Sequence, residues 1–411
     1  MAHIAFVEAS ITGAGHLAIE FAKAAGHEVT FISRDPAIYA RCIPTLGDRV
    51  VVTETNDHVK LAKLVQQLHA QTPFDGITTT ADFHVPQAAA AAQAIGLPAL
   101  TFGGAMNARN KYRMRELLRR RVPHLNPGYA YVITEEDVSR AAAFIGFPCV
   151  VKPLNNNNGN NVRLIEDEAE LRAYWTWSKS WTTNSSKQKL EDGFLIEALI
   201  QGAEVSVETV QACHGVRQLI GVTGKTLTAI ERGHFVESAH CFPIDDVDVD
   251  LLFSEVSAAL DTLDVTCGVI HTECRITPSG IKLIEVNPRL AGGKIGSHLV
   301  ELATGVNPVR QVIDIALGKN VTWTRAFSRG AAIRYVSAPR AGCFMGLENQ
   351  EELRALPGVN EVFVLKELGE PVAPPKANED RLVAIIAEAN NAKIALQRVD
   401  AAAACVRLKI D

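Results

Sequence analysis

Short apolar runs alternate with amphipathic segments over the first hundred residues. Four of the runs have the length and flanking residues of buried strands, and three intervening segments have the apolar spacing of helices: strands at 4–7, 29–33, 49–53 and 77–80, helices at 17–25, 59–70 and 86–95. Strands that alternate with helices are typical of a parallel sheet. The pattern therefore predicts an N-terminal α/β domain, a Rossmann-like parallel βαβ unit over residues 1–108.

A second unit, predicted over residues 109–200, begins with a helix that Lys111 opens and Pro123 ends. Its five arginines are expected to form a solvated basic face. A buried strand then delivers Lys152 at its exit, directly before an asparagine- and glycine-rich segment, residues 155–162. Asn and Gly tolerate positive φ, so successive N–H groups of this segment can turn toward an anion. The segment is predicted to be a flexible loop that covers phosphate.

An apolar bend separates the next two predicted strands, with Glu197 before it and Glu204 after it. Period-2 alternation puts Glu204 and Glu208 on one face of the second strand, where they could simply face solvent. An adenosine site needs apolar walls, backbone hydrogen bonds and a carboxylate for the ribose hydroxyls. The bend and its flanking glutamates are thus a candidate adenosine site.

A turn at residues 278–280 joins two further short strands. With uniform pairing about this turn, Glu273 faces Glu285, and Asn287 lies on the same face. Facing carboxylates destabilise a ladder unless a cation binds them, and Mg²⁺ takes carboxylate and amide oxygens. Arg289, just beyond, is placed for the anionic oxygens of a phosphate or carboxylate. A solvated edge face, or a one-residue register slip, is the alternative.

Of the 411 residues, 47% are hydrophobic and 21% charged, with a net charge of −5. This composition predicts a globular enzyme of several domains and disfavours a nucleic-acid partner. No secretory pattern opens the sequence and no apolar run reaches membrane-spanning length, so a cytoplasmic protein without a membrane partner is expected. The eight cysteines lack CxxC spacing, and Cys149, Cys213 and Cys267 lie in apolar runs. They are expected to be buried thiols rather than disulfide or zinc cysteines.

The chain resembles the ATP-grasp superfamily over nearly its whole length. The resemblance rests on the order and spacing of these motifs: Lys111, Val-Val-Lys152-Pro, the asparagine loop, Glu197 with Gly202-Ala-Glu204, and Glu273 with Glu285-Val-Asn287-Pro-Arg289. It implies an ATP-dependent carboxylate–amine or carboxylate–thiol ligase with ATP between two α+β lobes. Residues 109–200 would be the small lobe, 201–325 the large lobe with the metal site, and 326–411 a small C-terminal α+β lid.

The resemblance also implies a role for each matched residue. The implied ATP-binding residues are Lys111, Lys152, Asn158, Gly159, Asn160, Glu197, Ala198, Ile200 and Glu204, and the implied Mg²⁺ ligands are Glu273, Glu285 and Asn287. Arg289 would bind the acyl phosphate, and it shares the implied catalytic role with Lys152. ATP and Mg²⁺ are the implied cofactors, with two metal ions and Mn²⁺ as an alternative metal. The loop departs from the family pattern, which is rich in glycine and serine there.

Within the superfamily, the chain looks most like the L-amino-acid ligases that make dipeptides. Its segment Phe235-Val-Glu237-Ser-Ala-His240 resembles their substrate segment, and Glu237 could hold an α-amino group while His240 orients a substrate. Gly292 and Gly293 would leave space beside Arg289. The expected reaction joins a carboxylate to an amino acid through an acyl phosphate, releasing ADP and phosphate, in dipeptide, antibiotic or other natural-product biosynthesis.

Other functions stay open from the sequence alone. A purine-biosynthetic or biotin-carboxylase-type enzyme would share the ATP residues but act on other small molecules. A nucleotide-binding module without catalysis belongs to a different class, and the complete metal set argues against it. The sequence sets no oligomeric state, so a homodimer is open as well.

Overall fold

The computed structural model describes residues 1–11, 13–230 and 233–411. Its N-terminal part is a parallel sheet of strand order β3-β2-β1-β4. Strands β1 to β4 span His3–Val7, Glu28–Ser33, Arg49–Val52 and Gly76–Thr78, and helices α1 to α3 span Ala14–Ala24, His58–Gln71 and Val85–Ala94. The predicted parallel βαβ sheet is confirmed, although the first helix begins at Ala14 rather than at residue 17.

Helices α4 (Phe102–Arg109) and α5 (Lys111–Arg121) lead from this sheet into the second unit. Asn110 separates them, and its side chain accepts a hydrogen bond from the backbone N–H of Arg113 at 2.8 Å. Asparagine is a favoured N-cap because it satisfies a backbone donor of the first turn. The cap fixes Lys111 at the start of α5, where its N–H also donates to Leu154 O at 2.9 Å.

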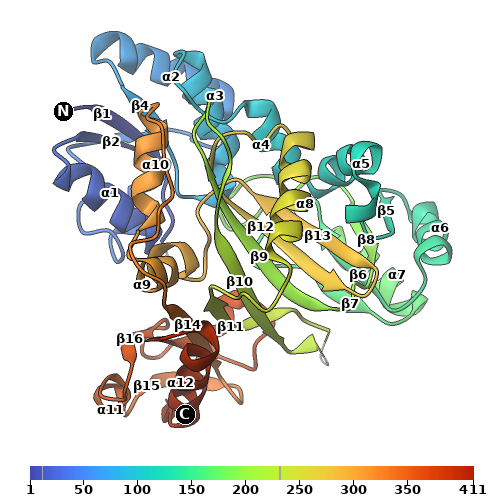
Figure 1. Ribbon diagram of the computed structural model, residues 1–411. Coiled ribbons are helices and arrows are strands. Elements are labelled where there is room, and N and C mark those ends of the chain that lie inside the picture. The colour runs from blue at the N-terminus through green and yellow to red at the C-terminus, as the bar shows by residue number, and fades with distance from the viewer. Residues whose placement is uncertain (12, 231–232) are drawn as a thin grey trace.

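The small lobe is an antiparallel sheet of order β5-β8-β6-β7 with two helices packed on it. The strands β5 to β8 span Tyr129–Val132, Cys149–Pro153, Arg163–Ile165 and Phe194–Ala198, and helices α6 and α7 span Glu135–Ile145 and Glu168–Ser178. Apolar residues of the strands and both helices form its core. The lobe lies on the right of Figure 1, beside the long strands of the large sheet.

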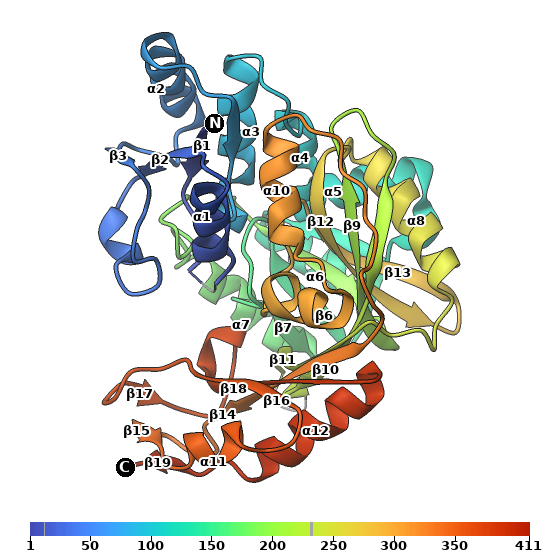
Figure 2. The same cartoon turned by 60° about the vertical axis from the view of Figure 1, so that its left-hand side comes forward.

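The large sheet has the order β13-β12-β9-β10-β11-β14-β18-β16. Its strands β9 to β14, β16 and β18 span Ala203–Gln211, Gln218–Thr228, Val236–Phe242, Gly268–Thr277, Gly280–Asn287, Gly330–Ser337, Val359–Val364 and Arg381–Ala389. Because β14, β18 and β16 continue the sheet, the C-terminal segment expected as a lid is joined to the large lobe by backbone hydrogen bonds. Helices α8 (Val249–Thr262) and α10 (Pro308–Ala316) pack against this sheet, and α10 lies between it and the N-terminal sheet (Figure 2).

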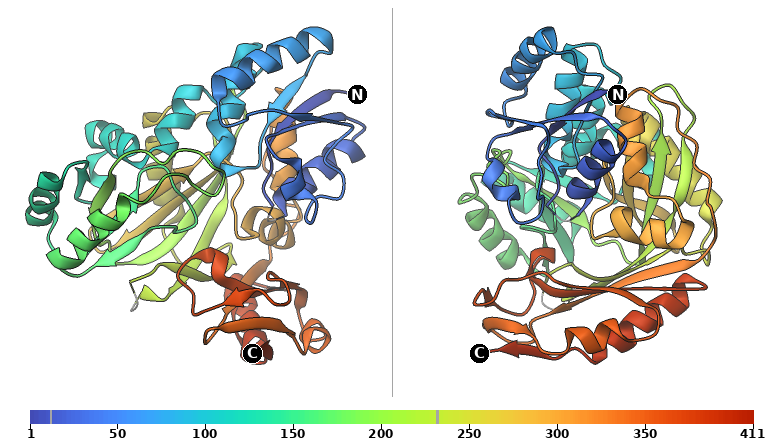
Figure 3. Two further views of the ribbon diagram at one scale, coloured as in Figure 1. Left: turned by 180° about the vertical axis from the view of Figure 1, so that it is seen from behind. Right: turned by 90° about the vertical axis from the view of Figure 1, so that its left-hand side faces the viewer.

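The remaining C-terminal elements form a layer at the opposite end of the molecule from the N-terminus (Figure 3). Helix α12 packs on β14 and β18. This helix spans Ala392–Ala404. The layer also contains the helix α11 (Gln350–Arg354) and a short sheet of order β17-β15-β19, whose strands are Pro371–Val372, Gly342–Leu347 and Leu408–Ile410. A π-helix (Ile295–Leu299) and α9 (Val300–Thr304) follow the hairpin β12–β13. None of the described helices has the length and apolar character needed to cross a membrane.

The hairpin β12–β13 has the predicted register at its functional end but not near its turn. Glu273 pairs with Glu285 as predicted. A bulge then shifts the register, so that Cys274 pairs with Leu283 instead of residue 284. A bulge places two residues of one strand opposite one residue of the other and increases the local twist. Uniform pairing was therefore wrong for the turn half of the hairpin and right for the half that carries the carboxylates.

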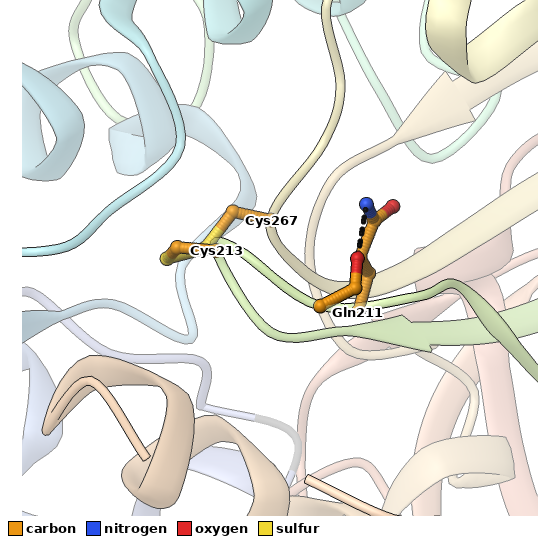
Figure 4. Close-up of a disulfide and its surroundings, with 4 residues drawn as sticks. Gln211, Cys213 and Cys267 are labelled. Carbon is orange, nitrogen blue, oxygen red and sulfur yellow. Dashed lines mark hydrogen bonds between the residues drawn. A yellow bond between two sulfur atoms is a disulfide. The ribbon is translucent and has the colours of Figure 1, made fainter. Parts of the chain in front are cut away.

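One pair of cysteines departs from the sequence expectation. Cys213 and Cys267 form a disulfide, with their Cα atoms 4.4 Å apart (Figure 4). The expectation of thiols was wrong for this pair because the two residues are 54 positions apart in the sequence and meet only through the sheet. The end of β9 pairs with the start of β12, Gln211 opposite Gly268, and this brings the flanking cysteines together. Cys149 is a buried free thiol, as expected.

Candidate active site

The hairpin β12–β13 brings two glutamates face to face. Glu273 and Glu285 are opposite each other, and the side-chain amide of Asn287 donates to Glu285 Oε1 at 2.9 Å. Two carboxylates and an amide are hard oxygen ligands of the kind that Mg²⁺ takes. Within the described chain, no group of three or more His, Cys, Asp or Glu side chains surrounds a metal position. The hairpin therefore fits a Mg²⁺ site that is completed by oxygens from outside the protein, such as nucleotide phosphates.

A lysine lies against each of the facing glutamates. Lys111 Nζ is 2.9 Å from Glu285 Oε2, and Lys225 Nζ, from β10, is 2.7 Å from Glu273 Oε1. Burial alone would raise the pKa of both carboxyl groups, but the adjacent lysines hold the pKa of each below its usual value. Both glutamates are therefore anions, and the lysines offset the repulsion expected between facing carboxylates. Lys225 was not identified from the sequence.

His271 was also missed, although the sequence carried a signal for it. It lies two residues before Glu273 on the same strand, and therefore on the same face. Its Nδ1 is 2.9 Å from Glu208 Oε2 and its Nε2 is 3.1 Å from Glu273 Oε1. Burial alone would lower the pKa of His271, but the two carboxylates raise it to about 9. His271 is thus a cation that fixes the orientation of Glu273.

Lys152 is buried and forms an ion pair instead of facing solvent. Its Nζ lies 2.7 Å from Glu197 Oε2, and Arg115 from α5 donates to both oxygens of the same carboxylate at 2.8 and 3.2 Å. The expectation that all five arginines of α5 are solvated was wrong for Arg115, which is 0% exposed. It is buried because its side chain reaches β13, where it donates to the Leu283 and Ile284 carbonyls. Glu197 therefore positions Lys152. The predicted contact between Glu197 and adenine stays a prediction.

The bend after β8 is tied to the hairpin by one arginine. Arg275 of β12 donates to the Ile200 carbonyl and, at 2.9 Å, to Glu204 Oε2. Ala198, the last residue of β8, donates its N–H to Gly128 O at 2.8 Å. Ala198 at the end of β8 and Glu204 at the start of β9 thus lie on either side of the bend, and Arg275 joins the bend to β12. This position is compatible with their predicted role, which stays a prediction.

The asparagine loop has the backbone geometry predicted for it. Asn158 and Gly159 have φ of 57° and 74°, in the left-handed region that Asn and Gly tolerate. The side-chain amides of Asn158 and Asn160 both donate to Glu379 Oε1, at 3.3 and 3.1 Å. Lys111 Nζ donates to the carbonyl of Asn156 in the same loop at 3.0 Å. The loop therefore lies between Lys111 and the C-terminal segment.

Arg289 is held by an aspartate from the N-terminal domain. Asp82 Oδ1 accepts from Arg289 Nε at 3.1 Å, while its other oxygen accepts from Arg109 at 3.3 Å. Asp82 also helps to line a cavity of about 10 Å³ with Arg109, Lys111, Glu285 and Asn287. Asp82 was not identified from the sequence, because the contact joins positions that are 207 residues apart. Arg289 thus lies at the junction of the N-terminal domain and the hairpin β12–β13.

Glu237 and His240 lie on β11, and His240 is next to Gly293. Both His240 ring nitrogens lack a hydrogen-bond partner among the described residues, although the residue is only 1% exposed. Burial lowers the pKa of His240 to about 3, so the ring is neutral. A Cβ added to Gly293 would be 3.0 Å from His240 Nε2, whereas Gly292 has open space up to Arg289 Nη1 at 4.0 Å. The absence of a side chain at Gly293 permits its close contact with His240, and Gly292 leaves room beside Arg289.

Three family models match consecutive parts of the chain. The ATP-grasp N-terminal domain matches residues 19–99, the ATP-grasp domain matches residues 145–298, and the L-amino acid ligase C-terminal domain 2 matches residues 334–411. These matches cover strands β2 to β4 of the parallel sheet, the hairpin β12–β13 and the C-terminal layer in turn. The predicted superfamily is thereby confirmed.

Relatives with curated descriptions match part of the chain. An uncharacterized protein of Sinorhizobium fredii, y4rH, is 28% identical over 64% of this chain and 53% of its own length. A formate-dependent phosphoribosylglycinamide formyltransferase of Chlorobium phaeobacteroides is 24% identical over 44% of each chain. The matches with these relatives therefore span about half of their length or less.

Solved structures match the whole fold. An L-amino acid ligase from Bacillus licheniformis superposes with a TM-score of 0.83 at 22% identity, covering 100% of this chain and 99% of that one. A phosphoribosylglycinamide synthetase from Anaerococcus prevotii superposes with a TM-score of 0.70 at 16% identity and covers all of both chains. Identities this low establish the fold alone, which is the ATP-grasp fold in each case. Together with the three matched domains, they identify the chain as a member of the ATP-grasp superfamily, whose members are ADP-forming ligases, with the C-terminal domain of the L-amino acid ligases.

Proposed function

We propose that this protein joins the carboxylate of one substrate to the amino group of an amino acid, using ATP and forming an acyl phosphate. The observation that carries the proposal is the buried imidazole of His240 beside Gly293, close to the site that holds Glu273, Glu285 and Arg289. Neither ring nitrogen has a hydrogen bond among the described residues, and the nearest carboxylate, that of Glu237, is 3.6 Å from Nε2. A buried polar group without a partner is costly unless a ligand completes it. The match to the L-amino acid ligase C-terminal domain supports an amino acid as that ligand.

Each residue of the site has a separate role in the proposed reaction. Mg²⁺ at Glu273, Glu285 and Asn287 would supply charge neutralisation to the triphosphate. Lys152, held by Glu197, places a positive charge next to this position, and the asparagine loop excludes water when it closes. Arg289 carries a fixed charge that can stabilise the acyl phosphate and the oxyanion formed when the amine attacks. Neutral His240 can donate a hydrogen bond to the amino-acid substrate from one ring nitrogen and accept one from it at the other.

A purine-type ligase is the second candidate, because a relative with that description matches part of the chain. It would use a phosphoribosyl amine instead of an amino acid. Both candidate enzymes form ADP, so the two functions are distinguished by which amine, an amino acid or a phosphoribosyl amine, appears in the product.

The decisive experiment is a screen for phosphate release over pairs of amino acids and over phosphoribosyl amines, with mass spectrometry of the products. We expect ADP and phosphate only when a free carboxylate is present, and an amide product when the right amino acid is added. Hydroxylamine should trap the activated acid as a hydroxamate. AMP and pyrophosphate as products would overturn the proposed chemistry, because an acyl phosphate forms only by attack on the γ-phosphorus.

Lys152→Ala is expected to lower phosphoryl transfer by about 100-fold, while adenosine binding stays within about threefold of wild type. The lysine acts as a point charge on phosphate and not on the base. The fold should survive, because Glu197 keeps its two hydrogen bonds from Arg115. Steady-state kinetics and adenosine titration by calorimetry measure the two effects. Equal losses of adenosine and ATP affinity would instead make Lys152 a structural residue.

A further inference from the structure

Lys225 connects the two halves of the candidate site. It lies on β10 with a side chain that is only 1% exposed. Its Nζ donates to Glu237 Oε1 at 2.8 Å and to Glu273 Oε1 at 2.7 Å. Glu237 belongs to the proposed substrate residues and Glu273 to the proposed metal ligands. One ammonium group is therefore shared between two carboxylates with different tasks.

Each of these carboxylates also has partners of its own. Glu237 Oε2 accepts from Arg381 Nη2 at 3.0 Å and from Asn378 Nδ2 at 3.1 Å, both in the C-terminal segment. Glu273 Oε1 is also contacted by His271 at 3.1 Å. Neither glutamate would be left without a cationic neighbour if Lys225 moved to the other. The position of the Lys225 ammonium can therefore follow the charge at either carboxylate.

A divalent cation at Glu273 would bind the same carboxylate that Lys225 contacts. The metal and the ammonium would then repel each other and compete for one carboxylate. Glu237 is the alternative partner within hydrogen-bond distance of Lys225. Occupation of Glu273 by metal should thus shift Lys225 toward Glu237, and stronger pairing with Glu237 should favour the metal. Two binding events that bias a shared group in this way are coupled reciprocally.

We propose that Lys225 is a positioning residue that competes with the metal for Glu273 and transmits metal binding to Glu237. The proposal rests on the proposed function only for the roles of these two glutamates. It predicts opposite effects of two substitutions on metal affinity. Lys225→Met removes the competitor and should tighten Mn²⁺ binding about tenfold, the size of one charge-assisted hydrogen bond. Glu237→Gln leaves Lys225 with Glu273 as its one hydrogen-bonded carboxylate among the described residues and should weaken Mn²⁺ binding.

The test is a double-mutant cycle on Mn²⁺ affinity, with free Mn²⁺ followed by electron paramagnetic resonance, both without nucleotide and with ADP. If Lys225 mediates the effect, Glu237→Gln changes Mn²⁺ affinity in the wild-type background but not in the Lys225→Met background. A purely long-range field effect would give the same change in both backgrounds and would overturn the proposal. The matched control is Lys282→Met, which removes a lysine of the same hairpin that contacts the His124 carbonyl and should leave Mn²⁺ affinity unchanged.

Further variants separate the ways in which the proposal could fail. Lys225→Gln replaces Lys225→Met if circular dichroism shows that the methionine variant is unfolded, and loss of fold in both would make Lys225 structural. Glu285→Gln should abolish Mn²⁺ binding. Equal binding by wild type and Glu285→Gln, or no binding by wild type in either condition, would overturn the metal site and this proposal together. If the double-mutant cycle gives the expected result but no amide product is found, only the proposed function is overturned.

Discussion

A Glu285→Gln protein is expected to lose at least about 1,000-fold of kcat, because a metal ligand contributes several kcal/mol of transition-state stabilisation. The substitution removes one negative oxygen from the hairpin and keeps the size of the side chain. It also removes the counterion of Lys111, whose ammonium lies 2.9 Å from Glu285. Since each facing glutamate is already offset by a lysine, we expect no gain in thermal stability from removing one of them.

The loss should be measured as kcat at saturating ATP over a range of Mg²⁺ concentrations, with thermal melting to confirm the fold. Glu255→Gln is the matched control, because Glu255 lies on α8 and pairs with the surface residue His124 at 2.7 Å. A folded Glu285→Gln protein with near-normal kcat at ordinary Mg²⁺ would show that the hairpin does not bind the metal.

The sequence was sufficient for features that depend on short-range periodicity. The facing of Glu273 and Glu285 follows from the two-residue period of a strand and from the turn that joins the strands. The start of a helix at Lys111 and the position of Lys152 near the end of a strand are equally local. The bulge near the turn was missed, because a bulge depends on how the strand must bend to pack and not on the alternation itself.

Contacts between distant segments could not be predicted from one sequence. Arg115 resembles the four exposed arginines of α5, and only its burial and its hydrogen bonds to carbonyls of β13 distinguish it. Asp82 and Lys225 lie in segments without a motif, yet they hold Arg289 and Glu273. Buried charges need partners, so each buried cation of a motif implies an acid elsewhere. The existence of such an acid could have been predicted from the sequence, but the residue that supplies it could not.

Arg289→Ala is expected to suppress both the hydroxamate and the amide by about 100- to 1,000-fold, the cost of removing one donor to a developing oxyanion. The arginine supplies a charge that alanine cannot replace, and the loss should appear in kcat more than in the KM for ATP. The fold should tolerate the change, because Asp82 retains Arg109 at 3.3 Å and Asn157 at 2.9 Å.

Hydroxylamine locates the step at which Arg289 acts. If the guanidinium holds the acyl phosphate, the hydroxamate and the amide fall together. Stabilisation of the tetrahedral oxyanion also affects both products, because hydroxylamine attacks the same carbonyl. If the guanidinium acts only by positioning the amino-acid substrate, the hydroxamate is retained and the amide is lost. Arg217→Ala is the matched control, because Arg217 pairs with Asp261 at 2.8 Å near α8 and should leave both products unchanged. Retention of both products in Arg289→Ala would remove Arg289 from the reaction and leave it as the structural partner of Asp82.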